Sequence, residues 1–189
     1  WRNLGHARGN RTVFLSLLGI SWLWFFGATF LTTFTGFAKE ALGGDQQVVT
    51  LLLAIFSLGI GAGSLLCERL SGHKVEIGLV PFGSIGMTLF AVDLWLASEG
   101  LQPHGLAGVA AFVADASHWR VMADLALLSL FAGLYSVPMY ALIQLRSQPT
   151  HRARIIAANN ILNALFMVAS ALICAALLAA GLSLTALIL

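Results

Sequence analysis

Charged side chains are scarce in this sequence. Asp, Glu, Lys and Arg make up 10% of its 189 residues, whereas 59% are hydrophobic and the mean hydropathy is +0.89. A soluble domain carries roughly a quarter charged residues to cover its water-facing surface, so this composition excludes an ordinary soluble domain. The net charge is only +2 and the basic residues stand in short clusters, so nothing in the sequence points to nucleic acid as a partner.

Cysteine is nearly absent as well. Cys67 and Cys174 each lie at or inside an apolar run, which indicates buried, unpaired thiols and disfavours a disulfide or a metal site. The zinc-protease pattern HExxH does not occur, and all five histidines lie outside the apolar runs, away from any buried serine that they would have to activate. The sequence therefore predicts no catalytic residue, no metal and no cofactor in this segment.

What the sequence does contain is a series of long apolar runs, at residues 12–37, 48–67, 77–97, 121–145 and 155–180. Each has about 20 residues or more, enough for a helix to cross about 30 Å of hydrocarbon. Another run starts at residue 184, after Gly181 and Ser183, which suit a helix stop and start. We predict an all-α membrane protein with five transmembrane helices and a truncated sixth, behind a polar lead-in at 1–11. We also expect the chain to be a piece of a longer protein.

Lys and Arg are divided unevenly between alternate turns. Eight of them lie in one set of turns and two in the other. The eight are Arg2, Arg8, Arg11, Arg69, Lys74, Arg146, Arg152 and Arg154, and the two are Lys39 and Arg120. Because cytoplasmic loops are enriched in Lys and Arg, the bias predicts a cytoplasmic N-terminus, an outer loop at 98–119 and a cytoplasmic turn at 146–154.

Small residues and a proline mark two of the runs. Gly59 and Gly63 are four residues apart in the run 48–67, and Gly61 stands between them. Small side chains let helix backbones approach closely, so we expect this run to pack through its glycines. Pro138 in the run 121–145 removes a backbone hydrogen bond and favours a kink, which is typical of a moving helix that lines a cavity.

Three amides, Asn159, Asn160 and Asn163, lie near the start of the last long run, just after the basic turn. An amide in hydrocarbon needs a partner, so these side chains should face protein or a water-filled cavity. Two interpretations stay open. The amides either hold helices together by hydrogen bonds or form a polar lining that meets a substrate headgroup. Asn163 is the deepest of the three and is our best candidate for the lining.

Hydroxyl groups supply further lining candidates. Thr29 and Thr33 share a helix face in the run 12–37, although threonine hydroxyls usually bond back to their own helix. Tyr135 and Tyr140 flank Pro138 in a flexible, aromatic stretch. For all four side chains, lining and packing both remain open.

Several stretches resemble the C-terminal half of a major facilitator superfamily transporter, in its lysophospholipid transporter branch. They are WRN at the start, VVTLLLAIFSLGIGAGSLLCERLSG at 48–72, SVPMYALIQLRS at 136–147 and AANNILNALFMV at 157–168. The resemblance implies that the five runs are helices seven to eleven of a twelve-helix bundle in the bacterial inner membrane. It implies a secondary transporter that moves lysophospholipid inward for reacylation. Its expected partners are membrane lipids, an N-terminal six-helix half, and fused acyltransferase and acyl-carrier-protein ligase domains.

The same resemblance assigns roles to charged residues. Asp124 falls on a helix that lines the cavity in the superfamily, which implies a candidate for ion coupling, while an interfacial carboxylate is the alternative. Glu68, Arg69 and Lys74 match part of the superfamily's cytoplasmic signature, G-x-x-x-D-R-x-G-R-R, with Glu68 in place of aspartate and Ser64 in place of the first glycine. The resemblance implies a gating-loop role for these three residues.

Other functions compete with lysophospholipid transport. The chain could be a non-transporting membrane anchor for fused phospholipid-recycling enzymes, or a transporter of another small amphipathic solute. An acyltransferase of the fused type needs a histidine and an aspartate with four residues between them, whereas five residues lie between His118 and Asp124. We therefore expect this segment not to be an enzyme.

Overall fold

The computed structural model describes residues 11–72, 74–99, 101, 105–147, 150–183 and 187. Its helices are α2 (Arg11–Gly36), α3 (Gln46–Leu70), α4 (Leu79–Glu99), the short α5 (Val109–Ala114), α6 (Ser117–Arg146) and α7 (Arg152–Ala179). In this described part, five helices are long and apolar enough to cross a membrane, all of those named except α5. The prediction of an all-helical chain with five spans is therefore confirmed. Residues 1–10 and most of the predicted sixth run lie outside the described residues.

Several helices extend beyond their predicted bounds by two to four residues. α6 begins at Ser117, four residues before the predicted start at 121, because Asp115 Oδ1 accepts hydrogen bonds from the Ser117 N–H at 2.9 Å and from its Oγ at 2.7 Å. These bonds satisfy donors at the helix start and hold the pKa of the Asp115 carboxyl below its usual range. α2 continues as the π-helix η1, Phe37–Ala41. The predicted loop at 98–119 therefore contains α5 and the first turn of α6.

The ends of α3 and α7 follow local sequence signals. Asp45 caps α3, because its Oδ1 accepts from the N–H groups of Gln47 and Val48 at 2.8 and 3.0 Å. α7 ends at Ala179, two residues before Gly181, whose φ of 91° suits glycine, and the Leu182 N–H bonds back to the Leu177 carbonyl at 3.1 Å. The predicted helix stop at Gly181 is confirmed, and it has the hydrogen bond of a Schellman turn.

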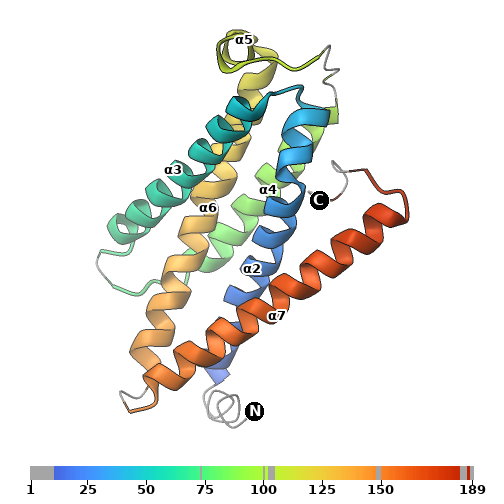
Figure 1. Cartoon of the computed structure of the whole chain (residues 1–189). Coiled ribbons are helices and arrows are strands. Elements are labelled where there is room, and N and C mark those ends of the chain that lie inside the picture. The colour runs from blue at the N-terminus through green and yellow to red at the C-terminus, as the bar shows by residue number, and fades with distance from the viewer. Residues whose placement is uncertain are drawn as a thin grey trace.

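α6 is the central helix of the bundle (Figure 1). It packs extensively against α3 and α4 and also against α2, and α7 packs against α2. Buried aromatic and aliphatic side chains from α2, α3, α4 and α6 form one core near the α5 end, and a smaller core joins α2, α6 and α7 near the opposite end. Cys67 and Cys174 are both buried and free, as the sequence predicted.

α3 and α6 meet backbone to backbone at small residues. Gly59 and Gly63 of α3 are buried, and a Cβ added at Gly63 would lie 2.8 Å from the Leu130 carbonyl carbon of α6. In the other direction, a Cβ at Gly133 of α6 would lie 2.6 Å from the Ile60 carbonyl oxygen. Both separations are shorter than van der Waals contact, so the two backbones can lie this close only where glycine removes the side chain.

Gly61 does not belong to this packing face, which corrects the prediction from sequence. A Cβ there would meet nothing within 4 Å among the described residues, because a step of two residues rotates a helical side chain by about 200°. α4 uses glycine in the same way as α3, which the sequence analysis missed. Gly83 lies against the backbone of Tyr135, and Gly86 lies against the ring of Phe131.

Gly63 and Gly61 therefore form a matched pair for testing the α3–α6 contact. Gly63→Leu should lower the free energy of unfolding by about 1–3 kcal/mol or more, because overpacking forces the helices apart. Gly61→Leu adds the same side chain on an open face and should melt near the parent. Thermal unfolding of the purified full-length protein in detergent measures both. Equal melting temperatures for the two variants would contradict the close backbone contact.

Candidate functional site

The amides of α7 point in two directions. Asn159 and Asn163 are buried, with 5% and 8% of their surfaces exposed, on the face of α7 that packs against α2. Asn160 is exposed. A spacing of four residues places Asn159 and Asn163 on one helix face. The structure thus brings together two of the three predicted amides and leaves the third on the bundle surface.

The amide of Asn163 fits its surroundings in two orientations. In one, the Ser21 hydroxyl donates to Asn163 Oδ1 at 2.9 Å. In the other, the amide nitrogen donates to Ser21 Oγ at 2.9 Å and to the Asn159 carbonyl at 3.2 Å, and the amide oxygen accepts from Trp24 Nε1 at 3.1 Å and Asn159 Nδ2 at 3.0 Å. The second orientation satisfies more donors and acceptors, which an environment without water favours.

Further polar contacts join α2 to α6 and α7. The Tyr135 hydroxyl donates to the Gly19 carbonyl at 3.1 Å, and Trp24 Nε1 lies 3.0 Å from the Tyr140 hydroxyl. The Thr29 hydroxyl bonds back to the Phe25 carbonyl and lies 2.7 Å from Ser170 Oγ of α7. Thr33 bonds only to carbonyls of its own helix in the contacts that the structure describes. We call this set the α2 seam: Gly19, Ser21, Trp24 and Thr29 of α2 with Tyr135, Tyr140, Asn163 and Ser170.

The α2 seam lies near the middle of the bundle. Ser21 is ten residues from the start of α2 and Asn163 is eleven from the start of α7, which places them about 15 and 17 Å along their helices. Most polar groups of the seam have a partner, so its first role is to hold α2, α6 and α7 together. Asn159 lies beside the seam, one helical turn before Asn163, and its buried Oδ1 acceptor has no hydrogen-bond partner among the described residues.

Asn160 lies among exposed residues of mixed size. Ala153, Ala157 and Ala164 share its side of α7 by helical spacing, and the larger exposed Ile156 and Met167 border them. The large exposed side chains Ile161, Leu165 and Leu172 share the neighbouring side. Large apolar side chains suit lipid, whereas small residues around an amide suit a neighbouring protein surface or a cavity. The structure thus favours Asn160, and not Asn163, as the amide that meets something outside this chain.

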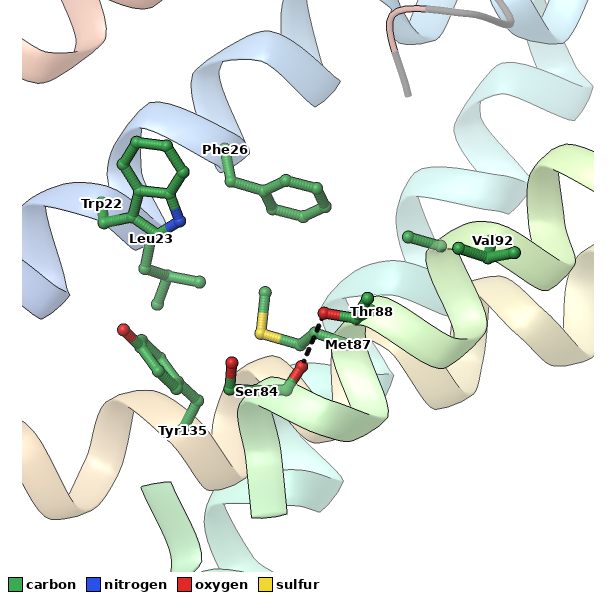
Figure 2. Close-up of a pocket in the computed structure, with 9 residues that line it drawn as sticks. Trp22, Leu23, Phe26, Ser84, Met87, Thr88, Val92 and Tyr135 are labelled. Atoms are coloured by element: carbon green, nitrogen blue, oxygen red, sulfur yellow. Dashed lines mark hydrogen bonds between the residues drawn. The ribbon is translucent and has the colours of Figure 1, made fainter. Parts of the chain in front are cut away.

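A cavity of about 220 Å³ lies between α2 and α4. Figure 2 shows Trp22, Leu23 and Phe26 of α2 facing Met87 of α4, with Tyr135 of α6 at one side. Its remaining lining residues are Ser84, Thr88, Ala91 and Val92. The hydroxyl of Thr88 donates to the Ser84 carbonyl at 3.0 Å, and that of Tyr135 to Gly19. Because these hydroxyls are already paired with carbonyls, the cavity offers mainly apolar surface, which suits an acyl chain or another helix.

The predicted gating residues lie at the α3–α4 turn. Glu68 and Lys74 line one cavity of about 260 Å³ together with Pro138 of α6. Arg69 is exposed at the end of α3. The structure therefore places the buried proline of α6 beside the turn that the resemblance assigned to gating, a proximity that the sequence did not reveal.

Charged residues meet at the opposite end of the bundle. Asp124 of α6 is buried, with 3% of its surface exposed. Arg120, one turn earlier on α6, forms a two-pronged ion pair with Asp93 of α4 through Nε, at 3.2 Å, and Nη2. The sequence analysis identified Asp93 and Asp124 but did not predict the ion pair of Asp93 with Arg120. The sequence does show that Arg120 and Asp124 are four residues apart, a spacing that places them on one face of α6.

Comparison of the chain with protein-family models, with curated proteins and with solved structures finds no match. Its function is therefore inferred from its own residues and their arrangement.

The α2 seam predicts unequal roles for neighbouring amides. Asn163→Ala should lower the free energy of unfolding by about 1 kcal/mol, because an interhelical hydrogen bond in the membrane has about that value. Asn160→Ala should leave stability near that of the parent, since Asn160 is exposed. A double-mutant cycle with Ser21→Ala, measured by thermal unfolding, should show coupling to Asn163 and none to Asn160. Coupling of the same size for both amides would contradict the seam.

Proposed function

We propose that this chain is half of a secondary transporter that moves lysophospholipid across the bacterial inner membrane for reacylation. The observation that carries the proposal is a reciprocal pattern of helix contacts. One unit consists of α2, α3 and α4, and the second begins with α6 and α7. The second helix of each unit packs against the first helix of the other, α3 against α6 and α7 against α2. The two first helices, α2 and α6, run in opposite directions (Figure 1). Inverted repeats of this kind build each half of major facilitator transporters.

The third helices extend the same symmetry. α4 packs against α6, so by the same symmetry a third helix of the second unit would pack against α2. The side of α2 available for it carries the exposed Leu15 and Trp22, with 54% and 60% of their surfaces exposed. That span would complete a six-helix half whose partner is the N-terminal half of the same protein.

Lysophospholipid fits the chemistry of the exposed surfaces. It has one acyl chain and one polar headgroup, and therefore needs apolar lining with few polar groups. Asn160 supplies an exposed hydrogen-bonding amide, and Phe26 and Met87 supply apolar surface. The substrate class rests on the resemblance of residues 136–147 and 157–168 to the lysophospholipid branch. The basic turn 146–154 would face the cytoplasm, where Arg146, Arg152 and Arg154 can meet anionic lipid headgroups.

Uptake of labelled lysophosphatidylethanolamine by spheroplasts that carry the full-length protein tests the proposal. Asn160→Ala should reduce uptake per folded molecule by about tenfold, the equivalent of one hydrogen bond to a charged headgroup. Ile161→Ala is the matched control, because Ile161 is exposed on the neighbouring, lipid-facing side. It should retain parental uptake.

The other outcomes decide between the remaining functions. A well-folded parent protein that takes up no lysophospholipid and no other amphipathic solute would contradict transport and favour a membrane anchor for fused acyltransferase and ligase domains. Uptake of a different amphipathic solute alone would contradict the substrate class while leaving the transporter fold. Parental uptake by Asn160→Ala would contradict the role of Asn160.

A further inference from the structure

Three charged side chains converge at the α5 end of the bundle. Asp93 of α4 and Arg120 of α6 form the two-pronged ion pair, with 34% and 56% of their side chains exposed. Asp124 lies one helical turn from Arg120 and is buried, and its Oδ2 has no hydrogen-bond partner among the described residues. These three residues therefore comprise a partly exposed ion pair and, beside it, a buried carboxyl group with an unpartnered oxygen.

The charges of this group do not balance. Two carboxylates face one guanidinium, and the guanidinium is engaged by Asp93. An ionised Asp124 would be an unpaired charge in a packed apolar region beside the buried Leu125 and Val121, which costs several kcal/mol. One additional positive charge is needed, and either a proton or a metal cation can supply it.

In the ion pairs that the structure describes, no other cation binds Asp124. Among the helices that pack against α6, α3 has no ionisable side chain from Gln46 to Leu66, and α2 has none after Arg11. α4 contributes Asp93 and, at its last residue, Glu99, and α5 contributes none. At the same end, Lys39 and Glu40 lie on η1, which continues α2. In the first turn of α6, His118 Nδ1 lies 3.9 Å from Asp115 Oδ2, and the His118 ring stacks on Phe112.

Few groups near Asp124 could serve as ligands for a metal cation, which favours a proton. Sodium sites in transporters use carbonyls freed by unwound helices, whereas α6 is a continuous helix from Ser117 to Arg146 around Asp124. In the part of the chain that the structure describes, no three His, Cys, Asp or Glu side chains gather as a metal site. The ion pair between Arg120 and Asp93 also leaves Asp124 without a cation of its own, and a proton on Asp124 removes that unpaired charge.

We propose that Asp124 is a proton-binding site that exchanges with water at the α5 end through Asp93 and Arg120. Protonation converts the Asp124 carboxylate and a hydronium ion into a neutral carboxylic acid and water, and its O–H can donate to Asp93. On release of the proton, Asp124 becomes a carboxylate whose nearest cation is Arg120. Arg120 then has two competing acceptors, Asp93 on α4 and Asp124 on its own helix, so protonation controls how firmly α4 is bound to α6.

Infrared difference spectroscopy of the purified full-length protein in lipid nanodiscs tests the site directly. At neutral pH the parent should show the carbonyl-stretch band of a protonated carboxylic acid, and Asp124→Asn should lack it. Asparagine has the shape of the protonated acid, so this variant should fold. Asp115→Asn is the control. Asp115 is ionised at neutral pH, because hydrogen bonds from Ser117 hold its pKa below the usual range, so its removal should leave the band unchanged.

Two further measurements decide between the alternatives. Asp93→Asn frees Arg120 to pair with Asp124, so the band should disappear at neutral pH, and its persistence would overturn the exchange of partners. Replacing potassium by sodium should leave the parental band unchanged, and its loss in sodium would overturn the proton site in favour of a cation site. A parental spectrum without the band, or a band that survives Asp124→Asn, would also overturn the proposal.

The coupling of this proton site to substrate movement rests on the proposed transport function. In the spheroplast assay, parental uptake should change with external pH, and Asp124→Asn should make uptake independent of pH without reducing the amount of folded protein. An equal pH response in parent and variant would overturn the coupling. Absence of uptake in the parent would contradict transport but not the proton site, which the infrared band tests alone.

Discussion

The structure depends on one constraint: a polar group inside hydrocarbon must find its partner within the protein. α2 has no charged residue after Arg11, and hydrogen bonds join it to α6 and α7. Tyr135 reaches the Gly19 carbonyl, and Asn163 reaches Ser21. Each bond is modest, about 1 kcal/mol, but together they specify which face of α2 lies inward. Asn159 and Asn163 are thus explained first by assembly, and Asn160 alone of the three amides is exposed.

The middle of the bundle and its α5 end satisfy this constraint differently. At the α2 seam, nearly every donor meets an acceptor, and the helices are held in one arrangement. At the α5 end, Asp124 has an oxygen without a partner, and Arg120 is shared between two possible acceptors. Glycine contacts place the backbones of α3 and α4 against α6, so a change in the charge of Asp124 acts on a closely packed helix pair.

Much of this fold could be predicted from the sequence, because span length and hydropathy are local properties. The five spans and the stop at Gly181 follow from them. The contacts were harder to predict. Gly61 was assigned to the packing face with Gly63, but only the helical phase relative to α6 shows that it points away. The pair Asp93 and Arg120 lies 27 positions apart on different helices, and no spacing rule connects residues across a turn. The same limit made Asn163 the favoured lining residue, since depth was visible in the sequence but the position of α2 was not.

The central claim is that this chain crosses the membrane repeatedly, with the acidic group and the basic turn on opposite sides. The most direct test uses Leu106→Cys and Thr150→Cys, two exposed positions separated along the chain by α6 as the single long helix between them. Each cysteine is placed in a full-length background in which Cys67 and Cys174 are replaced. In intact cells an impermeant maleimide should label the cysteine at position 106, and should label the one at 150 only after permeabilisation. Equal labelling of both in intact cells would contradict the account.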